Sequence, residues 1–226
     1  MTGWWLGVRC TRNPERLSQN FGLIRQSWRN EETTMARIDG VRKPRGLYQR
    51  LLFWMVKRRF GRVMEPLRVM CLHPQVLSAN AALELKLEKA RALSGALKGL
   101  VEQRVAQLIG CPFCVDFSQS LNLKRGTEAA KLQALPRWRE SSLFTQAERV
   151  ALEYAEAMTR LPLEVSDALF ERLRAHFSDQ QIIELTEFAA LENKRSRFNH
   201  ALGMKAEGFS EGALCHIPEA KSRSAA

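Results

Sequence analysis

The chain has 226 residues, of which 45% are hydrophobic and 26% charged. This composition is typical of a folded globular protein with a sizeable core, and it excludes disordered and collagen-like chains. The longest apolar run, Leu51 to Val56, has six residues. A membrane-spanning helix needs about 20, so we predict no integral membrane span. The five cysteines are an odd number and too few for a disulfide scaffold.

The net charge of +11 is concentrated at the N-terminal end of the chain. Residues 1–62 carry 14 basic and 4 acidic residues, whereas residues 63–226 carry 21 basic and 20 acidic residues. Few aromatic residues lie among the basic residues of 35–46, and no nucleic-acid-binding motif is recognised. We therefore expect no nucleic-acid partner, and a basic segment that touches nucleic acid or a membrane remains the non-catalytic alternative.

Residues 1–34 differ from the remainder of the chain, because they show neither a helical nor a strand period. Met35 could equally be the true start of the protein. We predict that 1–34 is a disordered leader or a mis-assigned start, with an organelle-targeting peptide as the alternative. Residues 35–226 are predicted to form a single domain whose core covers about 60–215.

The helical pattern begins near residue 47. Apolar residues at helical spacing in this first predicted helix are expected to pack on the body of the protein: Leu47, Leu51, Leu52, Met55 and Val56. Contact with an anionic membrane surface or a partner is the alternative for this helix. A second helix is predicted over 75–93, between Pro74 and the break at Ser94-Gly95.

The remaining apolar stripes and helix-capping signals also predict helices. In chain order these are 97–109 ended by Gly110, 112–124, a short helix before Pro136, 145–158, 167–177 and 178–203. Two of them open with a capping box, at Thr145 and at Ser178. No segment alternates in the manner of a strand. We therefore predict an all-α fold, a single-domain helical bundle.

The chemical signature of the chain is Cys111-Pro112-Phe113-Cys114, at the start of the predicted helix 112–124. Two thiols at this spacing can close a small disulfide ring. The helix start supplies backbone N–H groups and a dipole that stabilise a thiolate, which is the reactive form of cysteine. The motif therefore favours redox chemistry.

Three alternatives compete with this interpretation. A structural zinc site would need two more ligands, from Cys71 and His73 or from Cys215 and His216, at spacings that are not typical of zinc sites. A thioredoxin-like fold would need a strand before the motif, where the pattern is helical. The third alternative is a pair of inert core cysteines. We predict no bound metal and no cofactor.

Four segments of the chain resemble the carboxymuconolactone decarboxylase superfamily, specifically its alkylhydroperoxidase D-like branch. They are VEQRVAQLIGCPFC at 101–114, FTQAE at 144–148, YAEAMT at 154–159 and ENKRSRFNHALG at 192–203. The resemblance covers roughly residues 60–215. It implies an all-helical, homo-oligomeric, thiol-dependent peroxidase that reduces hydroperoxides, and it agrees with the helical pattern.

The resemblance also implies roles for the two cysteines. Cys114 would attack the peroxide and become a sulfenic acid, and Cys111 would then condense with it to a disulfide. An external dithiol would reduce the pair again. The lack of a signal peptide and of a disulfide scaffold predicts a cytoplasmic protein.

The chain departs from the branch pattern at the proton relay. The best-known members have a His four residues after the second cysteine, where this chain has Ser118. Their glutamate position is Gly99 here, and Glu102 lies one helical turn further on as the candidate carboxylate. Asp116 is a possible substitute base, although it could equally be an ordinary acid in the first turn of a helix.

A second reading is a lyase, like the enzyme that gives the superfamily its name, acting on a small acidic lactone. Such a substrate would need a cationic cleft, for which Arg104 is the candidate. The Cys-x-x-Cys motif argues against this reading, because the lyases do not depend on it.

Overall fold

The structure, a computed structural model, describes residues 36–210 and consists of helices joined by short connections within that range. The prediction for residues 1–34 lies outside the described residues. No helix within 36–210 is both long enough and apolar enough to cross a membrane. The predicted all-α fold is confirmed.

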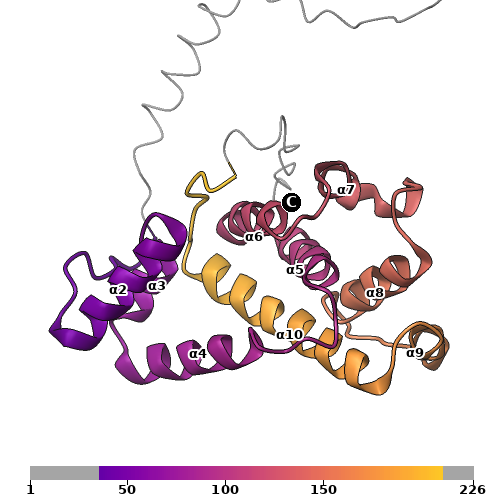
Figure 1. Ribbon diagram of the computed structural model, residues 1–226, viewed down its shortest axis with the longest axis horizontal. Coiled ribbons are helices and arrows are strands. Elements are labelled where there is room, and N and C mark those ends of the chain that lie inside the picture. The colour runs from indigo at the N-terminus through magenta and orange to yellow at the C-terminus, as the bar shows by residue number, and fades with distance from the viewer. Residues whose placement is uncertain (1–35, 211–226) are drawn as a thin grey trace, which may run out of the picture. The chain divides into compact units, whose positions relative to one another are not determined.

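The predicted helices occur in the predicted order, and two further short ones, α3 and η1, were not predicted; Figure 1 labels the α-helices. Their bounds are α2 (Gly46–Phe60), α3 (Glu65–Met70), α4 (Pro74–Leu87), α5 (Gly95–Ile109), α6 (Pro112–Lys124), α7 (Ala129–Ala134), the 3₁₀ helix η1 (Leu135–Glu140), α8 (Gln146–Ala157), α9 (Asp167–Arg174) and α10 (Asp179–Ala201).

Local sequence signals set several of these helix ends. Gly110 follows α5 in the left-handed conformation, with φ of 75°, which a residue with a side chain rarely adopts. Thr145 and Ser178 each accept a hydrogen bond from a first-turn N–H, and both capping boxes form as predicted.

Helix α5 lies in the middle of the helical body, where it packs against α6, α8 and α10 (Figure 1). Its residues Leu100, Val101, Val105 and Ala106 are completely buried. Burying a Leu or Val side chain contributes roughly 1.5–3 kcal/mol relative to leaving it in water. The C-terminal end of this well-packed helix leads directly into the Cys-x-x-Cys segment, which is therefore fixed by the core.

The predicted inward face of the first helix is only partly confirmed: Leu52 packs against a buried cluster and Val56 is half-buried, but the other three residues are not. Leu47, Leu51 and Met55 of α2 are exposed, and Phe53 is the buried residue of this helix. Phe53 packs in a small cluster with Val63 and other buried residues of the α2–α4 region. Both sides of α2 carry apolar side chains, so periodicity alone did not determine which side faces the protein.

Two predicted boundaries also differ from the structure. The helix predicted over 75–93 ends at Leu87, and a short turn follows it. The helix predicted over 167–177 ends at Arg174. The short helix predicted before Pro136 is confirmed, because α7 ends at Ala134 and Pro136 lies in the first turn of η1.

Candidate active site

Cys111 and Cys114 begin helix α6. Cys111 is the N-cap residue, and its sulfur accepts a hydrogen bond from the backbone N–H of Cys114 at 3.3 Å. Pro112 occupies the first turn, where a missing N–H is harmless. The two sulfur atoms lie 2.7 Å apart, and both thiols are free. The helix start thus holds both thiols in position to form a disulfide without any movement of α6.

Both thiols are buried. Cys111 is 0% exposed and Cys114 is 5% exposed. They form one apolar cluster with Phe113 and with Met204, which lies in the segment that follows α10. The thiols therefore lie beneath a covering layer of side chains.

The pKa values of the two thiols are shifted in opposite directions. The hydrogen bond between the two thiols lowers the pKa of Cys111 below its ordinary value, whereas the same bond and burial raise the pKa of Cys114. In the resting dithiol, the first negative charge therefore lies on Cys111. The Asn199 side chain donates a hydrogen bond to the Cys114 sulfur at 3.2 Å, and this bond favours negative charge there too.

A buried carboxyl group lies beside the thiols, on α10. Glu192 is 4% exposed, and its Oε1 accepts a hydrogen bond from Ser196 Oγ at 2.6 Å. Ser196 also acts on the Cys114 thiol, whose pKa it lowers. Burial, with the nearby Cys114 thiolate, raises the pKa of Glu192 well above the usual value for a glutamate. Glu192 therefore keeps its proton to a higher pH than an ordinary glutamate does.

Sequence reasoning missed three residues on this face. Glu192, Ser196 and Asn199 are spaced four and three residues apart, so they lie on one side of α10. All three are within the 192–203 segment that carries the family resemblance. A signal for them was present in the sequence: polar residues at helical spacing form a stripe on a helix that otherwise faces the core. Such a stripe can indicate one wall of a functional site.

Glu102 lies in the same region but does not contact a thiol. It is 5% exposed and is bound by Arg195 Nη1 at 2.8 Å and by Arg125 Nη1 at 3.2 Å. Arg195 also approaches Glu192, with 3.4 Å between Nη1 and Oε2. The structure thus places the predicted carboxylate one guanidinium away from Glu192, in a charged network behind the thiols.

Ser118 is buried and directs its hydroxyl away from the sulfur atoms. It donates to Gln103 Oε1 at 2.5 Å and to the backbone carbonyl of Cys114 at 2.7 Å. Gln103 in turn donates to the carbonyl of Val115 at 3.2 Å. These bonds support the first turns of α6 rather than a contact with the thiols.

Asp116 holds the segment that follows α10. Its carboxylate accepts hydrogen bonds from the backbone N–H groups of Glu207, Phe209 and Ser210, and from the Ser210 hydroxyl, at 2.7–2.9 Å. Burial opposes ionisation, but the four bonds together lower the pKa of Asp116. An ionised, fully bonded carboxylate is a poor base, so the geometry favours a structural role.

Gly99, where the family resemblance would put a glutamate, has no room for a larger side chain. The Asn122 side chain lies against Gly99, donating to its carbonyl at 3.0 Å, and a Cβ added to Gly99 would lie 1.6 Å from Asn122 Oδ1. The side chain of Asn122 thus takes the space that a larger residue at 99 would need.

The two alternative sites depended on Arg104 and on the candidate zinc ligands. Arg104 is engaged by Glu156, with 2.7 Å between Nε and Oε1, instead of lining an open cationic cleft. Within residues 36–210, no three His, Cys, Asp or Glu side chains group in a way that could hold a metal ion. Cys215 and His216 lie outside the described residues.

Comparison with known proteins places this fold and site in a family. The profile of the carboxymuconolactone decarboxylase family matches residues 74–157, which include both cysteines. The uncharacterized protein YnjA of Escherichia coli (strain K12) is 39% identical over 170 residues, covering 75% of this chain and 91% of YnjA. The chain therefore belongs to the carboxymuconolactone decarboxylase family, within its AhpD-like superfamily.

Solved structures agree with this assignment. A protein of unknown function from Agrobacterium tumefaciens, described as a candidate AhpD antioxidant defence protein, is 28% identical with a TM-score of 0.58 and covers 61% of this chain and 94% of its own. An uncharacterized peroxidase-related protein from Silicibacter sp. TM1040 has a TM-score of 0.72 at 20% identity, over 80% of this chain and 97% of its own. The second likeness is one of fold.

Proposed function

We propose that this protein is a thiol-dependent oxidoreductase that reduces hydroperoxides through a dithiol–disulfide cycle of Cys114 and Cys111. The observation that carries the proposal is the pair of free sulfur atoms 2.7 Å apart at the start of α6. An apolar surrounding and a nearby buried carboxyl group accompany the pair. Inert core cysteines would need neither the helix start nor the polar groups on α10.

The proposed cycle has three steps. The Cys114 thiolate attacks the terminal oxygen of the hydroperoxide, so that an S–O bond forms, the O–O bond breaks, and the alkoxide takes a proton to leave as an alcohol. Cys111 then attacks the Cys114 sulfenic acid, forming the disulfide and releasing water. An external dithiol reduces this disulfide and is itself oxidised, which balances the two electrons.

Glu192 takes the role of proton carrier in this cycle. Through Ser196 it accepts the proton of Cys114 and returns it to the departing alkoxide. Its raised pKa suits both transfers, because raising the pKa of a carboxyl makes its ionised form a stronger base toward the Cys114 proton, and its protonated form then returns that proton. Glu192 thereby supplies what the family histidine, replaced here by Ser118, supplies elsewhere.

Cys114 is proposed as the attacking thiol on two grounds. Cys114 is the slightly more exposed residue of the two, and Asn199 and Ser196 favour its thiolate. The negative charge that first lies on Cys111 moves to Cys114 when the proton between the sulfur atoms shifts to Cys111. The covering side chains around Met204 would have to move for a peroxide to reach either sulfur atom.

The test measures consumption of cumene hydroperoxide with dithiothreitol as reductant. We expect activity in the native protein and none in Cys114→Ser. In Cys111→Ser we expect a single turnover that leaves a sulfenic acid on Cys114, detected as its dimedone adduct by mass spectrometry. Cys71→Ser is the matched control, because Cys71 is a buried thiol in the separate α2–α4 cluster and should not affect activity.

Three results would contradict the proposal. They are no peroxide consumption by the reduced native protein, undiminished activity in Cys114→Ser, and a dimedone adduct confined to Cys71. Reduction by an external dithiol, a homo-oligomeric assembly and a cytoplasmic location belong to the same proposal. Product analysis, sedimentation velocity and cell fractionation test them in that order.

A further inference from the structure

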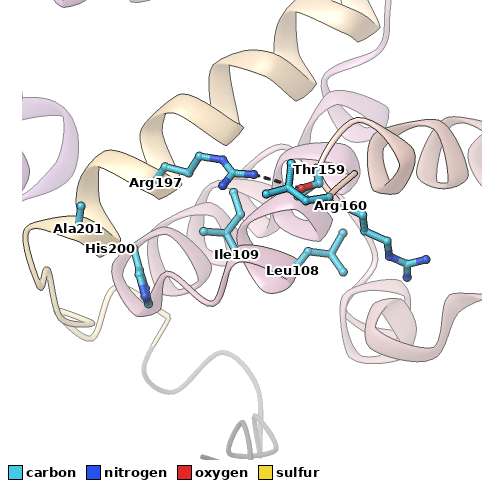
Figure 2. Close-up of a pocket in the computed structure, with 8 residues that line it drawn as sticks. Leu108, Ile109, Thr159, Arg160, Arg197, His200 and Ala201 are labelled. Atoms are coloured by element: carbon cyan, nitrogen blue, oxygen red, sulfur yellow. Dashed lines mark hydrogen bonds between the residues drawn. The ribbon is translucent and has the colours of Figure 1, made fainter. Parts of the chain in front are cut away.

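A pocket of about 440 Å³ lies beside the C-terminal end of α5, outside the thiol cluster described above. Figure 2 shows it between the C-terminal end of α5, the segment that follows α8 and the last turns of α10. Its apolar lining comes from Leu108 and Ile109 of α5 and from Leu161. This size is in the usual range for pockets that hold small organic molecules.

The polar lining of the pocket is cationic. Arg160, Arg197 and His200 line it, and no acidic residue does. Arg197 donates to the carbonyl of Thr159 at 3.1 Å, the dashed contact in Figure 2, and has no ion-pair partner among residues 36–210. Its positive charge is therefore not neutralised by the part of the chain that the structure describes.

The surroundings add further positive charge. Arg104, Arg139 and Arg160 all bind the single carboxylate of Glu156, at 2.7–2.9 Å. Three guanidinium groups on one carboxylate leave a local excess of two positive charges, before Arg197 is counted. This excess is unusual here, since residues 63–226 carry nearly equal numbers of basic and acidic residues. Such an excess beside an apolar hollow favours a negatively charged ligand.

The pocket adjoins the thiol site through the backbone and through α10. His200 Nδ1 lies 3.1 Å from the carbonyl oxygen of Gly110, the residue before Cys111. The neighbouring residue on α10, Asn199, donates to the Cys114 sulfur. Consecutive residues of one helix thus contact the pocket wall and the thiol, so a ligand in the pocket would lie next to the redox motif.

We propose that this pocket binds a small organic anion, with its apolar part on Leu108 and Ile109 and its carboxylate on Arg197 and Arg160. The carboxylate could belong to a hydroperoxide substrate or to a separate effector, and both present the same chemistry to the pocket. The binding claim stands independently of the proposed thiol cycle, because none of the lining residues takes part in it.

Isothermal titration calorimetry with octanoate, in low-salt buffer free of carboxylates, tests the proposal. We expect one saturable site for octanoate and at least tenfold weaker binding of octan-1-ol, which has the same chain without the charge. Arg197→Gln and Arg160→Gln should each weaken octanoate binding about tenfold, since each removes a charge-assisted hydrogen bond. Arg172→Gln is the matched control, because Arg172 is an exposed, ion-paired arginine on α9 away from the pocket.

Cys114→Ser keeps the binding claim separate from the thiol chemistry. It should bind octanoate with native affinity even if no peroxidase activity exists. A carboxylated hydroperoxide consumed faster than its methyl ester by native protein, but not by Arg197→Gln, identifies the anion as substrate. Inhibition or activation by octanoate without that preference identifies an effector. The proposal is overturned by absence of saturable octanoate binding below about 10 mM, by equal binding of octanol, or by unchanged affinity in both arginine variants.

Discussion

Glu192 illustrates how much the surroundings of one carboxyl group can change its chemistry. The side chain is almost fully buried, its one close hydrogen bond comes from Ser196, and Arg195 approaches it only at 3.4 Å. Asp116 is equally buried, but it accepts four hydrogen bonds and stays ionised. Two acids near the same thiols are therefore pushed in opposite directions by burial and by hydrogen bonding.

Replacing Glu192 by Gln keeps the shape and a hydrogen-bonding group but removes proton transfer. We expect peroxidase turnover to fall by about 10²–10⁴-fold, the usual contribution of a general acid–base group. The pH dependence should also change, because the limb that reports Glu192 ionisation disappears from the profile of kcat/KM. Unchanged turnover with an unchanged profile would remove Glu192 from the relay.

The same variant has a stability signature that does not depend on any activity. A carboxyl whose folded pKa is raised destabilises the folded state as pH rises above its unfolded pKa, which is near 4.5. Glu192→Gln should therefore gain stability over the native protein between pH 5 and pH 8, by up to about 1.4 kcal/mol per pH unit until the folded pKa is reached. Urea unfolding at both pH values measures the difference, and a constant difference would contradict a raised pKa.

At the scale of elements, the segment after α10 is a cover for the thiols. Met204 is buried in the thiol cluster, and the Phe209 ring packs edge-on against Phe113 and Phe117. Asp116 on α6 fixes the backbone of this segment through the N–H groups it accepts. A carboxylate inside a helix thus replaces the strand or helix partner that an irregular segment lacks.

Asp116→Ala should loosen this cover. We expect a loss of about 1–3 kcal/mol in unfolding free energy, because several N–H groups lose a charged acceptor. Alkylation of Cys114 by iodoacetamide should become several-fold faster. Asp167→Ala, at an exposed acid in the first turn of α9, is the control and should change neither measurement.

The lowered pKa of Asp116 determines how its hydrogen bonds to the segment after α10 depend on pH. Its contribution to stability is fully present above the unfolded pKa near 3.8 and is lost as pH falls through the lower folded value. Alkylation rates corrected for thiolate content should therefore not rise between pH 7 and pH 5. A rise in that interval would mean that another group holds the segment.

Helix α2 exposes several large apolar side chains and buries Phe53. Leu51 and Trp54 are 51% and 58% exposed, whereas Phe53 is 8% exposed. Leu51→Ala should change the unfolding free energy by less than about 0.5 kcal/mol, and Phe53→Ala should cost about 3–5 kcal/mol. Urea denaturation compares the two variants directly. A loss for Leu51→Ala as large as that for Phe53→Ala would show that this face is covered in solution.

At the scale of the whole molecule, the longer helices and both capping boxes could be predicted from the sequence, because periodicity and caps act over neighbouring residues, whereas the short α3 and η1 were not predicted. The cysteine pair could be predicted for the same reason. The face of α2 could not, since both of its sides are apolar and a distant cluster decides between them. Glu192 was missed because its raised pKa depends on burial and on the nearby charges of Cys114 and Glu102, which belong to helices far earlier in the sequence.

Arg195 joins parts of the molecule that are far apart in sequence. From α10 it binds Glu84 of α4, with 2.7 Å between Nε and Oε1, and Glu102 of α5. Burial alone would lower the pKa of Arg195, but its bonds with Glu84 and Glu102 raise it above the ordinary value. The guanidinium therefore stays charged and links α4 to the charged network behind the thiols.

Arg195→Met should destabilise the protein by about 3 kcal/mol, because Glu102 is left buried with only the partly exposed Arg125 as partner. Hydrogen exchange in α4 should increase more than in α9, which the network does not touch. Adding Glu102→Gln to Arg195→Met should recover part of the loss, since the double variant no longer buries an under-compensated charge. A double-mutant cycle measures this coupling. It compares the urea unfolding of the native protein, of each single variant and of the double variant. Strict additivity of the two losses would show that Arg195 and Glu102 do not act as a pair.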